Sequence, residues 1–257
     1  IEIARSPNTK VVIVGGQKDQ MPLILGSDIG NIPPGSTPVN QVSGNVSPLP
    51  EWAEMPSIFD DPLSDSRRPA TAPAGSIGSG KSPSEIIGDQ DNDTLIGGNF
   101  SDTLSGGDGN DRIFAAGGFD LVDGGNGDDE LYGQDGNDTL RGANGRDLLR
   151  GGTGHDVLNG DGGFDTLFGD QGDDTIRSGD GNDTVFAGSG RDSVLGNDGN
   201  DRLFGNDGYD TMSGGEGDDF LRGGRGQDLL SGDGGNDTLV GDEHDDTLFG
   251  GVGNDSL

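Results

Sequence analysis

A strict nine-residue period organises the chain from Gly88 to its last residue. Starting at Asp93, every ninth residue up to Asp255 is aspartate, which gives nineteen aspartates without an exception. Two residues after each aspartate stands a large apolar residue, from Leu95 to Leu257. A short period held this long predicts one small structural unit stacked many times, and it excludes a globular domain that folds once.

The unit reads Gly-Gly-x-Gly-x-Asp-x-U-x, where U is a large apolar residue, and residues 106–114 and 151–159 fit it at every fixed place. Positions one to six are mostly Gly, Asp and Asn, which reach left-handed backbone conformations at little steric cost. We therefore expect these positions to form a tight turn, and positions seven to nine to form a short strand. Where position two is not Gly it is usually Asp or Asn, as a backbone constraint requires: Asp161, Asp170, Asn197, Asn206 and Asp233.

Stacking follows from the single apolar side chain in each unit. One three-residue strand cannot bury that side chain alone, so the units must share a narrow core. Two units make one turn of 18 residues, with aspartate loops on two opposite edges. The apolar residue points inward and its two neighbours point outward, because side chains alternate along a strand.

In these repeats the sequence resembles the RTX (hemolysin-type) family, whose calcium-binding nonapeptide repeats occur in secreted bacterial proteins. The resemblance covers residues 88–257, about two thirds of the chain. It implies an all-β fold, a parallel β-roll solenoid of two short-stranded parallel sheets. It also implies export by a type I secretion machinery and an extracellular or cell-surface location.

The stacked aspartates create an electrostatic problem. Asp111, Asp129 and Asp147 fall on one edge, one turn apart, at the ~4.7–4.8 Å spacing of adjacent strands. Two carboxylates at that separation repel by roughly 1–4 kcal/mol, depending on the local dielectric. A cation between successive loops reverses the sign, and Ca²⁺ prefers carboxylate and carbonyl oxygens. Zinc and copper fit poorly, because the repeats contain no Cys and only His155 and His244.

Charge counting supports calcium. Residues 88–257 carry 38 Asp and Glu against nine Arg and no Lys, a formal charge of −29. Ten loops on one edge and nine on the other leave 17 gaps between successive loops, hence at most about 17 calcium ions. An acidic surface that only keeps the protein soluble is the alternative. Half of these acids occupy one fixed repeat position, which favours a ligand role.

The candidate metal ligands are the sixth-position aspartates: Asp111, Asp120, Asp129, Asp138, Asp147, Asp156, Asp165, Asp174, Asp183, Asp192, Asp201, Asp210, Asp219, Asp228, Asp237, Asp246 and Asp255. Asp93 and Asp102 belong to loops that depart from the pattern, since Asp91 and Phe100 replace the glycine at position four. His244 replaces that glycine in a third loop. A missing glycine would misplace a carbonyl oxygen, so we expect poorer sites in these loops, as is usual for terminal repeats of a solenoid.

Residues 1–87 have a different composition and hold all twelve prolines and all three lysines. Two short apolar runs in residues 1–29 fit the end of an upstream domain. We expect residues 30–87 to be a Pro/Ser/Gly-rich linker that is largely disordered. Residues 88–257 are the predicted roll of 19 nonapeptide repeats, the last one incomplete. The chain therefore has the features of a fragment.

Residues 75–82 match the phosphate-binding pattern G-x-x-x-x-G-K-S, which functions only between a buried strand and a helix. Prolines on both sides argue against that context. The chain contains neither His-Glu-x-x-His nor Gly-x-Ser-x-Gly, so we expect no enzyme activity within it, while a catalytic domain can lie outside the fragment. We also expect no nucleic-acid partner, and no apolar run is long enough to cross a membrane.

Three functions remain open. The first is a calcium-binding module that folds after export and has no enzymatic role. The second is the carrier portion of a secreted protease, lipase or cytolysin. The third is part of a surface adhesin. The sequence preceding Ile1 would discriminate among them.

The ninth repeat position points outward, and residues 18 apart lie on one face. One face carries an aromatic row with Arg150 and Arg222 interleaved, where cation–π contacts can form: Phe114, Tyr132, Phe168, Phe186 and Phe204. The other face has no such row. Either the rings stack to stiffen the roll, or they form a docking face. The candidate partners for docking are the upstream domain, the linker around Trp52, a second roll or a glycan.

Overall fold

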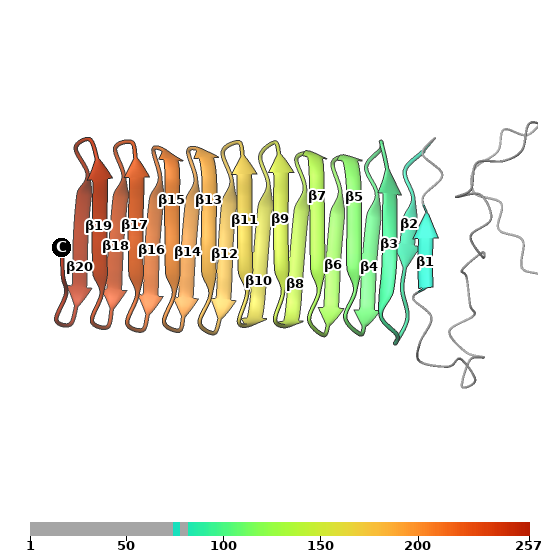
Figure 1. Cartoon of the computed structure of the whole chain (residues 1–257), viewed down its shortest axis with the longest axis horizontal. Coiled ribbons are helices and arrows are strands. Elements are labelled where there is room, and N and C mark those ends of the chain that lie inside the picture. The colour runs from blue at the N-terminus through green and yellow to red at the C-terminus, as the bar shows by residue number, and fades with distance from the viewer. Residues whose placement is uncertain (1–73, 78–81) are drawn as a thin grey trace, which may run out of the picture. The chain divides into compact units, whose positions relative to one another are not determined.

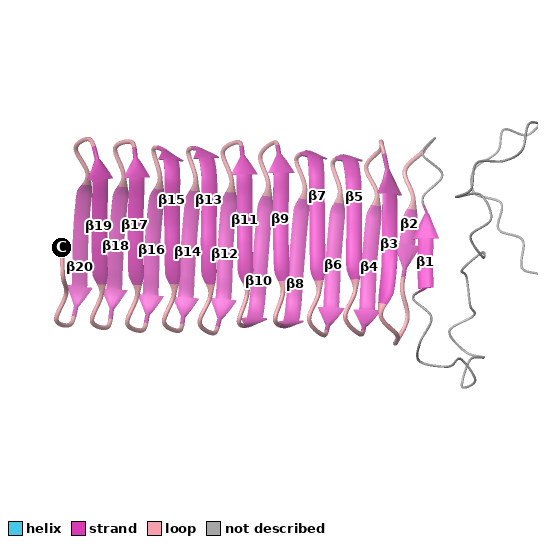
Figure 2. Cartoon of the chain, viewed as in Figure 1, coloured by secondary structure: helices cyan, strands magenta, loops and turns pink. Residues whose placement is uncertain are grey.

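The structure is a computed structural model that describes residues 74–77 and 82–257. These residues form twenty β-strands in two ten-stranded parallel sheets, and no helix occurs among them (Figures 1 and 2). The chain alternates between the sheets, so odd-numbered strands make the first sheet and even-numbered strands make the second. This is the predicted parallel β-roll. The expectations for residues 1–29 and for most of residues 30–87 lie outside the described residues.

The first sheet contains β1 (Ala74–Ile77), β3 (Asp93–Gly98), β5 (Arg112–Gly118), β7 (Glu130–Gly136), β9 (Leu148–Thr153), β11 (Thr166–Gln171), β13 (Thr184–Gly190), β15 (Arg202–Gly208), β17 (Phe220–Arg225) and β19 (Thr238–Glu243). The second sheet contains β2 (Glu85–Ile87), β4 (Thr103–Asp108), β6 (Leu121–Asn126), β8 (Thr139–Gly145), β10 (Val157–Gly163), β12 (Thr175–Asp180), β14 (Ser193–Asp198), β16 (Thr211–Glu216), β18 (Leu229–Gly234) and β20 (Thr247–Val252).

The register between neighbouring strands confirms two repeats per turn. Leu167 pairs with Val185 and Phe168 with Phe186, each 18 residues further along the chain. Most strands have six or seven residues, so they are longer than the three-residue strands that the sequence predicts. They run on through position three of the next repeat, because pairing skips position one and resumes at position two, as between Asp161 and Gly179.

Position two carries the backbone constraint expected from its composition. Asp161 has a φ of 71° and Asn197 a φ of 77°, both in the left-handed region. Asp170, Asn206 and Asp233 lie there too. Asn and Asp are the non-glycine residues that adopt this conformation most readily, which explains their preference for this position.

The core is a single row of apolar side chains between the sheets. It consists of the predicted position-eight residues, joined by Ala115 and Ala187 at position one. Ile113, Leu140 and Leu203 have no exposed surface. The flanking positions seven and nine are half-buried or exposed, as alternation along a strand requires. Towards the C-terminal end the apolar side chains become more exposed to solvent: Leu248 is only partly buried, and Leu257 is 70% exposed.

The roll begins earlier than Gly88. Strands β1 and β2 both lie within residues 30–87, where the sequence predicts a linker. Ile86 stands nine residues before Leu95, pairs with Leu104 and is 2% exposed. The nine-residue spacing of buried apolar residues therefore continues before Gly88, although the nine-residue spacing of aspartates does not. The phosphate-loop pattern also falls here, and strand β2 follows Pro83 where that loop would require a helix.

Among residues 74–77 and 82–257 there is no helix of the length and apolar character needed to cross a membrane.

Candidate calcium sites

The structure brings the predicted ligands together in two rows, one along each edge of the roll. Each row contains one aspartate per 18-residue turn, because the two rows occupy alternate loops. From Asp93 to Asp237 these side chains are at most 4% exposed, and Asp246 and Asp255 at the C-terminal end are half-buried. Aspartate is rarely buried this completely unless its charge has a partner.

One carboxylate oxygen of each aspartate links successive turns. The backbone N–H of Asp147 donates to Oδ1 of Asp165 (2.9 Å), and the N–H of Asp165 donates to Oδ1 of Asp183 (2.7 Å). The same bond recurs along both edges from Asp93 to Asp255, and we call these bonds the aspartate ladder. The sixth-position side chain is therefore a structural link as well as a candidate ligand, a role the sequence analysis did not foresee.

The second carboxylate oxygen has a different environment. Within residues 82–257, Oδ2 is buried and has no hydrogen-bond partner in fifteen of these aspartates: Asp111, Asp120, Asp129, Asp138, Asp147, Asp156, Asp165, Asp174, Asp183, Asp192, Asp201, Asp210, Asp219, Asp228 and Asp237. A buried charged oxygen without a partner costs free energy, so these atoms require a cation or a proton.

The two N-terminal loops differ from the others. The N–H of Asp89 donates to Oδ2 of Asp93 (2.9 Å), and the N–H of Gly98 donates to Oδ2 of Asp102 (2.7 Å). These are two of the loops that lack glycine at position four. In the third such loop, His244 adopts a φ of 88°, which is unfavourable for a residue with a side chain.

The glycine at position one leaves open the space into which Oδ2 points. A Cβ added to Gly133 would lie 2.5 Å from Oδ2 of Asp138 and 2.6 Å from the carbonyl oxygen of Gly151 in the next turn. A Cβ added to Gly205 would meet the corresponding two oxygens at 2.5 and 2.6 Å. Oxygens from two successive turns thus converge beside each position-one glycine.

Burial changes the acidity of these carboxyls. It raises the pKa of Asp165 from 3.8 to about 7; the backbone N–H of Asp147 opposes the rise, and the charges of Asp147 and Asp183 add to it. The sixth-position pKa is raised to about 6 in Asp111, Asp120, Asp210 and Asp219, and to about 7 in Asp129, Asp147, Asp156, Asp165, Asp192 and Asp201. The predicted repulsion between aspartates along each edge contributes to the raised pKa values, but desolvation by burial contributes more.

The donor set fits calcium. Within the described residues, no three His, Cys, Asp or Glu side chains gather around one point, so a site built from carboxylates or imidazoles alone is absent there. What successive loops offer is a buried carboxylate oxygen and nearby backbone carbonyls. These are hard oxygen donors, which suit the flexible coordination of Ca²⁺ by six to eight oxygens.

Position five forms a second ladder that the sequence analysis missed. The N–H of Asn110 donates to Oδ1 of Asn92 (2.9 Å), and the N–H of Asp173 donates to Nδ1 of His155 (2.8 Å). Here the side chain belongs to the earlier turn, so this ladder runs opposite to the aspartate ladder. Its signal in the sequence is the frequency of Asn and Asp immediately before the fixed aspartate.

Two sheets of stacked repeats with buried aspartate rows define a class of protein, the metal-binding parallel β-roll. The family model described as RTX calcium-binding nonapeptide repeat (4 copies) matches residues 87–122, 123–158, 159–194, 195–230 and 226–257. The chain belongs to this RTX family, whose repeats bind Ca²⁺ in a β-roll, and its repeat region is structural rather than catalytic. A comparison with curated proteins finds no matching relative.

Proposed function

We propose that the chain is a calcium-dependent folding module in which the sixth-position aspartates hold the ions. The observation that carries this proposal is the two rows of buried Oδ2 atoms from Asp111 to Asp237, which lack a hydrogen-bond partner within residues 82–257. Each ion lies between successive loops of one edge, so the nineteen loops provide at most about 17 sites. The ligands are Asp111 to Asp255 at nine-residue steps, with Asp93 and Asp102 in poorer sites.

The ion supplies the positive charge that the buried carboxylates need. A full set of about 17 divalent ions would carry +34, against the formal charge of −29 on residues 88–257. Without the ions, a chain this acidic with a core one residue wide does not offset its conformational entropy. Binding free energy then becomes folding free energy.

Calcium-dependent folding gives a rationale for export. The cytosol contains little free calcium, which would keep the chain unfolded and able to pass a type I secretion channel. Higher calcium outside would fold the roll and prevent its return. We therefore propose an extracellular or cell-surface location, with the roll acting as a folding and carrier module that has no enzyme activity of its own.

The test combines calcium stoichiometry with far-UV circular dichroism of the 257-residue chain. Titration of the metal-free chain should bring a cooperative gain of β-sheet signal, with several ions bound per chain, and EGTA should reverse it. A β-sheet spectrum that the chelator leaves unchanged would contradict the folding mechanism. Binding of only one or two ions would contradict the assignment of the aspartate rows.

A further inference from the structure

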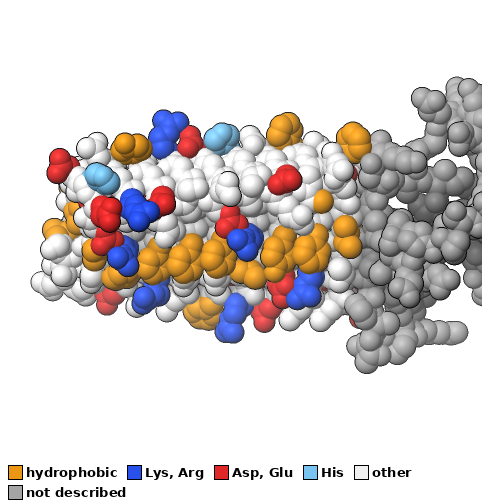
Figure 3. Space-filling view, turned by 45° about the horizontal axis from the view of Figure 1, so that its top comes forward, with side chains coloured by type: hydrophobic (Ala, Val, Ile, Leu, Met, Phe, Trp, Pro, Cys, Tyr) orange, Lys and Arg blue, Asp and Glu red, His pale blue; other side chains and the backbone are white. Residues whose placement is uncertain are grey.

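The outer side of the first sheet carries the predicted aromatic row, and we call the position-seven and position-nine side chains of β3 to β19 the aromatic face. Ring centroids of Phe168 and Phe186 are 5.1 Å apart, and those of Phe186 and Phe204 are 4.9 Å apart, with the rings nearly parallel. Arg150 lies 6.0 Å from the Phe168 ring, which confirms a predicted cation–π contact. Stacking leaves the rings half-buried, and Figure 3 shows a band of hydrophobic side chains along the roll.

The first sheet is close to electrical neutrality, in contrast to the rest of the roll. Its outward side chains include five of the nine arginines of the repeats and six acidic residues: Arg112, Arg150, Arg202, Arg222, Arg225, Glu130, Asp135, Asp170, Asp207, Asp242 and Glu243. The second sheet presents two arginines, Arg141 and Arg177, against eight acidic residues: Glu85, Asp108, Asp123, Asp161, Asp180, Asp198, Glu216 and Asp233.

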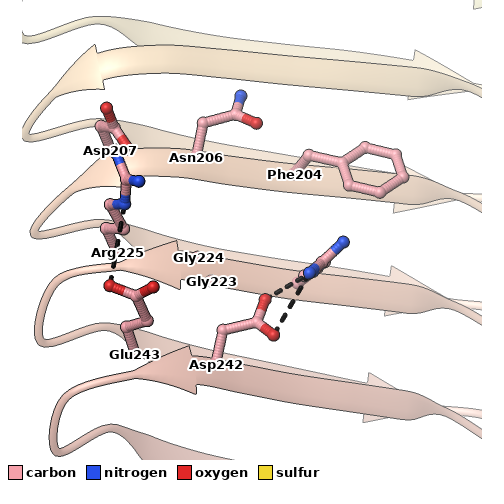
Figure 4. Close-up of a pocket in the computed structure, with 9 residues that line it drawn as sticks. Phe204, Asn206, Asp207, Gly223, Gly224, Arg225, Asp242 and Glu243 are labelled. Atoms are coloured by element: carbon pink, nitrogen blue, oxygen red, sulfur yellow. Dashed lines mark hydrogen bonds and ion pairs between the residues drawn. The ribbon is translucent and has the colours of Figure 1, made fainter.

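Ion pairs neutralise the first sheet locally. Arg150 pairs with Asp170, and Arg222 pairs with Asp242. Arg225 lies 3.7 Å from Glu243, and the close-up in Figure 4 shows the ion pairs of Asp242 and Glu243 on either side of Gly223 and Gly224. These pairs are exposed, so each adds little to the stability of the roll. Their consequence is a surface that another acidic molecule can approach without repulsion.

The dimensions of this surface suit a protein partner. Figure 1 shows the strands running side by side with little twist, which makes the face flat. Nine strands at a spacing of about 4.8 Å, presenting about 15 Å of each strand, give about 600 Å² per copy. Two copies would bury about 1,200 Å² in total, the lower limit of specific and stable interfaces.

The order of residues along the face is complementary to itself. A two-fold axis parallel to the strands and over β11, the middle strand of the nine, places β7 of one copy over β15 of the other. Glu130, which is paired with Arg112 of its own copy (2.7 Å), then faces Arg202 of the second copy, and Arg150 faces the ring of Phe186. Thr166 lies on the axis and faces itself. At positions seven and nine, opposite charges and cation–π partners thus meet without any like pair. Outside these positions, Asp135 faces Asp207, which is paired with Arg225 of its own copy, and Asp170 lies on the axis, paired with Arg150 of its own copy.

We propose that the aromatic face is a self-association surface through which two calcium-filled rolls form an antiparallel dimer. The partner is a second copy of this chain. The inference rests on the calcium-bound roll proposed above, because the face exists only when the strands are stacked.

Sedimentation velocity of the full chain in saturating calcium tests the dimer, at concentrations from about 1 to about 100 μM, where interfaces at this size limit dissociate. Glu130→Arg alone and Arg202→Glu alone each create a like-charge pair across the axis, and each should weaken the dimer at least about tenfold. Glu130→Arg also removes the exposed ion pair with Arg112 of the same copy, so Arg202→Glu is the single variant that leaves this ion pair intact. The double variant Glu130→Arg/Arg202→Glu restores opposite charges across the two-fold axis and should recover the dimer. Thr175→Glu, on the second sheet, is the matched control and should leave it unchanged.

Far-UV circular dichroism of every variant separates this inference from the calcium mechanism. Each variant should keep the calcium-induced β-sheet signal while its association changes. A folded wild-type chain that stays monomeric throughout overturns the dimer and leaves the face to a glycan or another protein. A double variant no better than the single ones, or a control that dissociates equally, overturns the arrangement. Absence of the calcium-induced signal in the wild type would instead contradict the calcium mechanism itself.

Discussion

Protons should partly replace calcium in folding the roll, because both neutralise the same buried carboxyls. Asp165 has its pKa raised from 3.8 to about 7, mainly by burial. In the metal-free roll this means that folding binds protons between about pH 4 and pH 7. The stability of the metal-free roll is therefore highest at acidic pH, and it is lost as the pH rises towards 7.

The magnitude follows from the pKa values. A shift of about three units corresponds to about 4 kcal/mol per aspartate at neutral pH, and we halve this figure because water near the loops screens the charge. Ten sixth-position aspartates have a pKa raised to about 6 or 7. Together they oppose metal-free folding at neutral pH by about 20 kcal/mol, which exceeds the 5–15 kcal/mol stability typical of a domain.

The assay is far-UV circular dichroism of the chain after removal of all divalent ions, at about pH 7.5 and about pH 5.5. The β-sheet signal should be absent at the higher pH and should appear in part at the lower one. Calcium titration should show the reverse trend, with affinity falling below about pH 7 because protons compete for the ligands. At about pH 5.5, where the metal-free roll is partly folded and protonated, calorimetry in buffers of different ionisation enthalpy should also detect protons released on calcium binding.

Two outcomes would refute this reasoning. The first is a metal-free spectrum that does not change between the two pH values. The second is calcium affinity that is independent of pH in this range. Either result would mean that the sixth-position carboxyls have ordinary acidity in the folded roll, and that desolvation is not what opposes metal-free folding.

Two substitution pairs test the loops. Asp165→Asn keeps the Oδ1 acceptor but removes the negative charge. It should therefore stabilise the metal-free roll at neutral pH by about 2 kcal/mol and weaken calcium binding. The control variant Asp161→Asn, at position two, should have neither effect. Equal calcium titrations of the two variants would contradict the ligand assignment. Gly163→Ala should divide the roll into two separately folding blocks, because the added Cβ would overlap the carbonyl oxygen of Gly145. In the control variant Gly162→Ala, the atom nearest to the added Cβ is 3.8 Å away, so this substitution should be tolerated. Calcium-induced folding curves that are two-state for both alanine variants would show that position four tolerates a side chain.

The periodic features of the fold could be predicted from the sequence. The 18-residue turn, the inward apolar row, the aromatic row and the left-handed position two all follow from the nine-residue step. The length of the strands could not be predicted, because a left-handed residue ordinarily ends a strand. Here the pairing continues past Asp161, since the neighbouring turn has a left-handed residue, Gly179, at the same place.

The start of the roll was missed for a similar reason. The repeats are recognisable in the sequence by their aspartates, and Ser84 stands nine residues before Asp93, where a preceding aspartate would be. Ile86 keeps the apolar step, and the N–H of Ser84 donates to Oδ1 of Asp102 (2.6 Å), so the backbone continues the ladder without an acid. In the candidate site, the sequence identified the aspartates but not their burial. That burial depends on hydrogen bonds between turns, which no single repeat reveals.

The two ladders together indicate why position six is always aspartate. Position five also accepts an N–H from a neighbouring turn, and there Asn92, Ser101 and His155 all fulfil the role. Asparagine at position six would satisfy the Oδ1 bond equally well, so the ladder alone does not require a carboxylate. The remaining difference is the negative charge on Oδ2, which is buried beside a space that glycine keeps open. A buried charge retained in the seventeen successive repeats from Asp93 to Asp237 destabilises the protein unless a cation accompanies it, and therefore the fold itself argues for the metal.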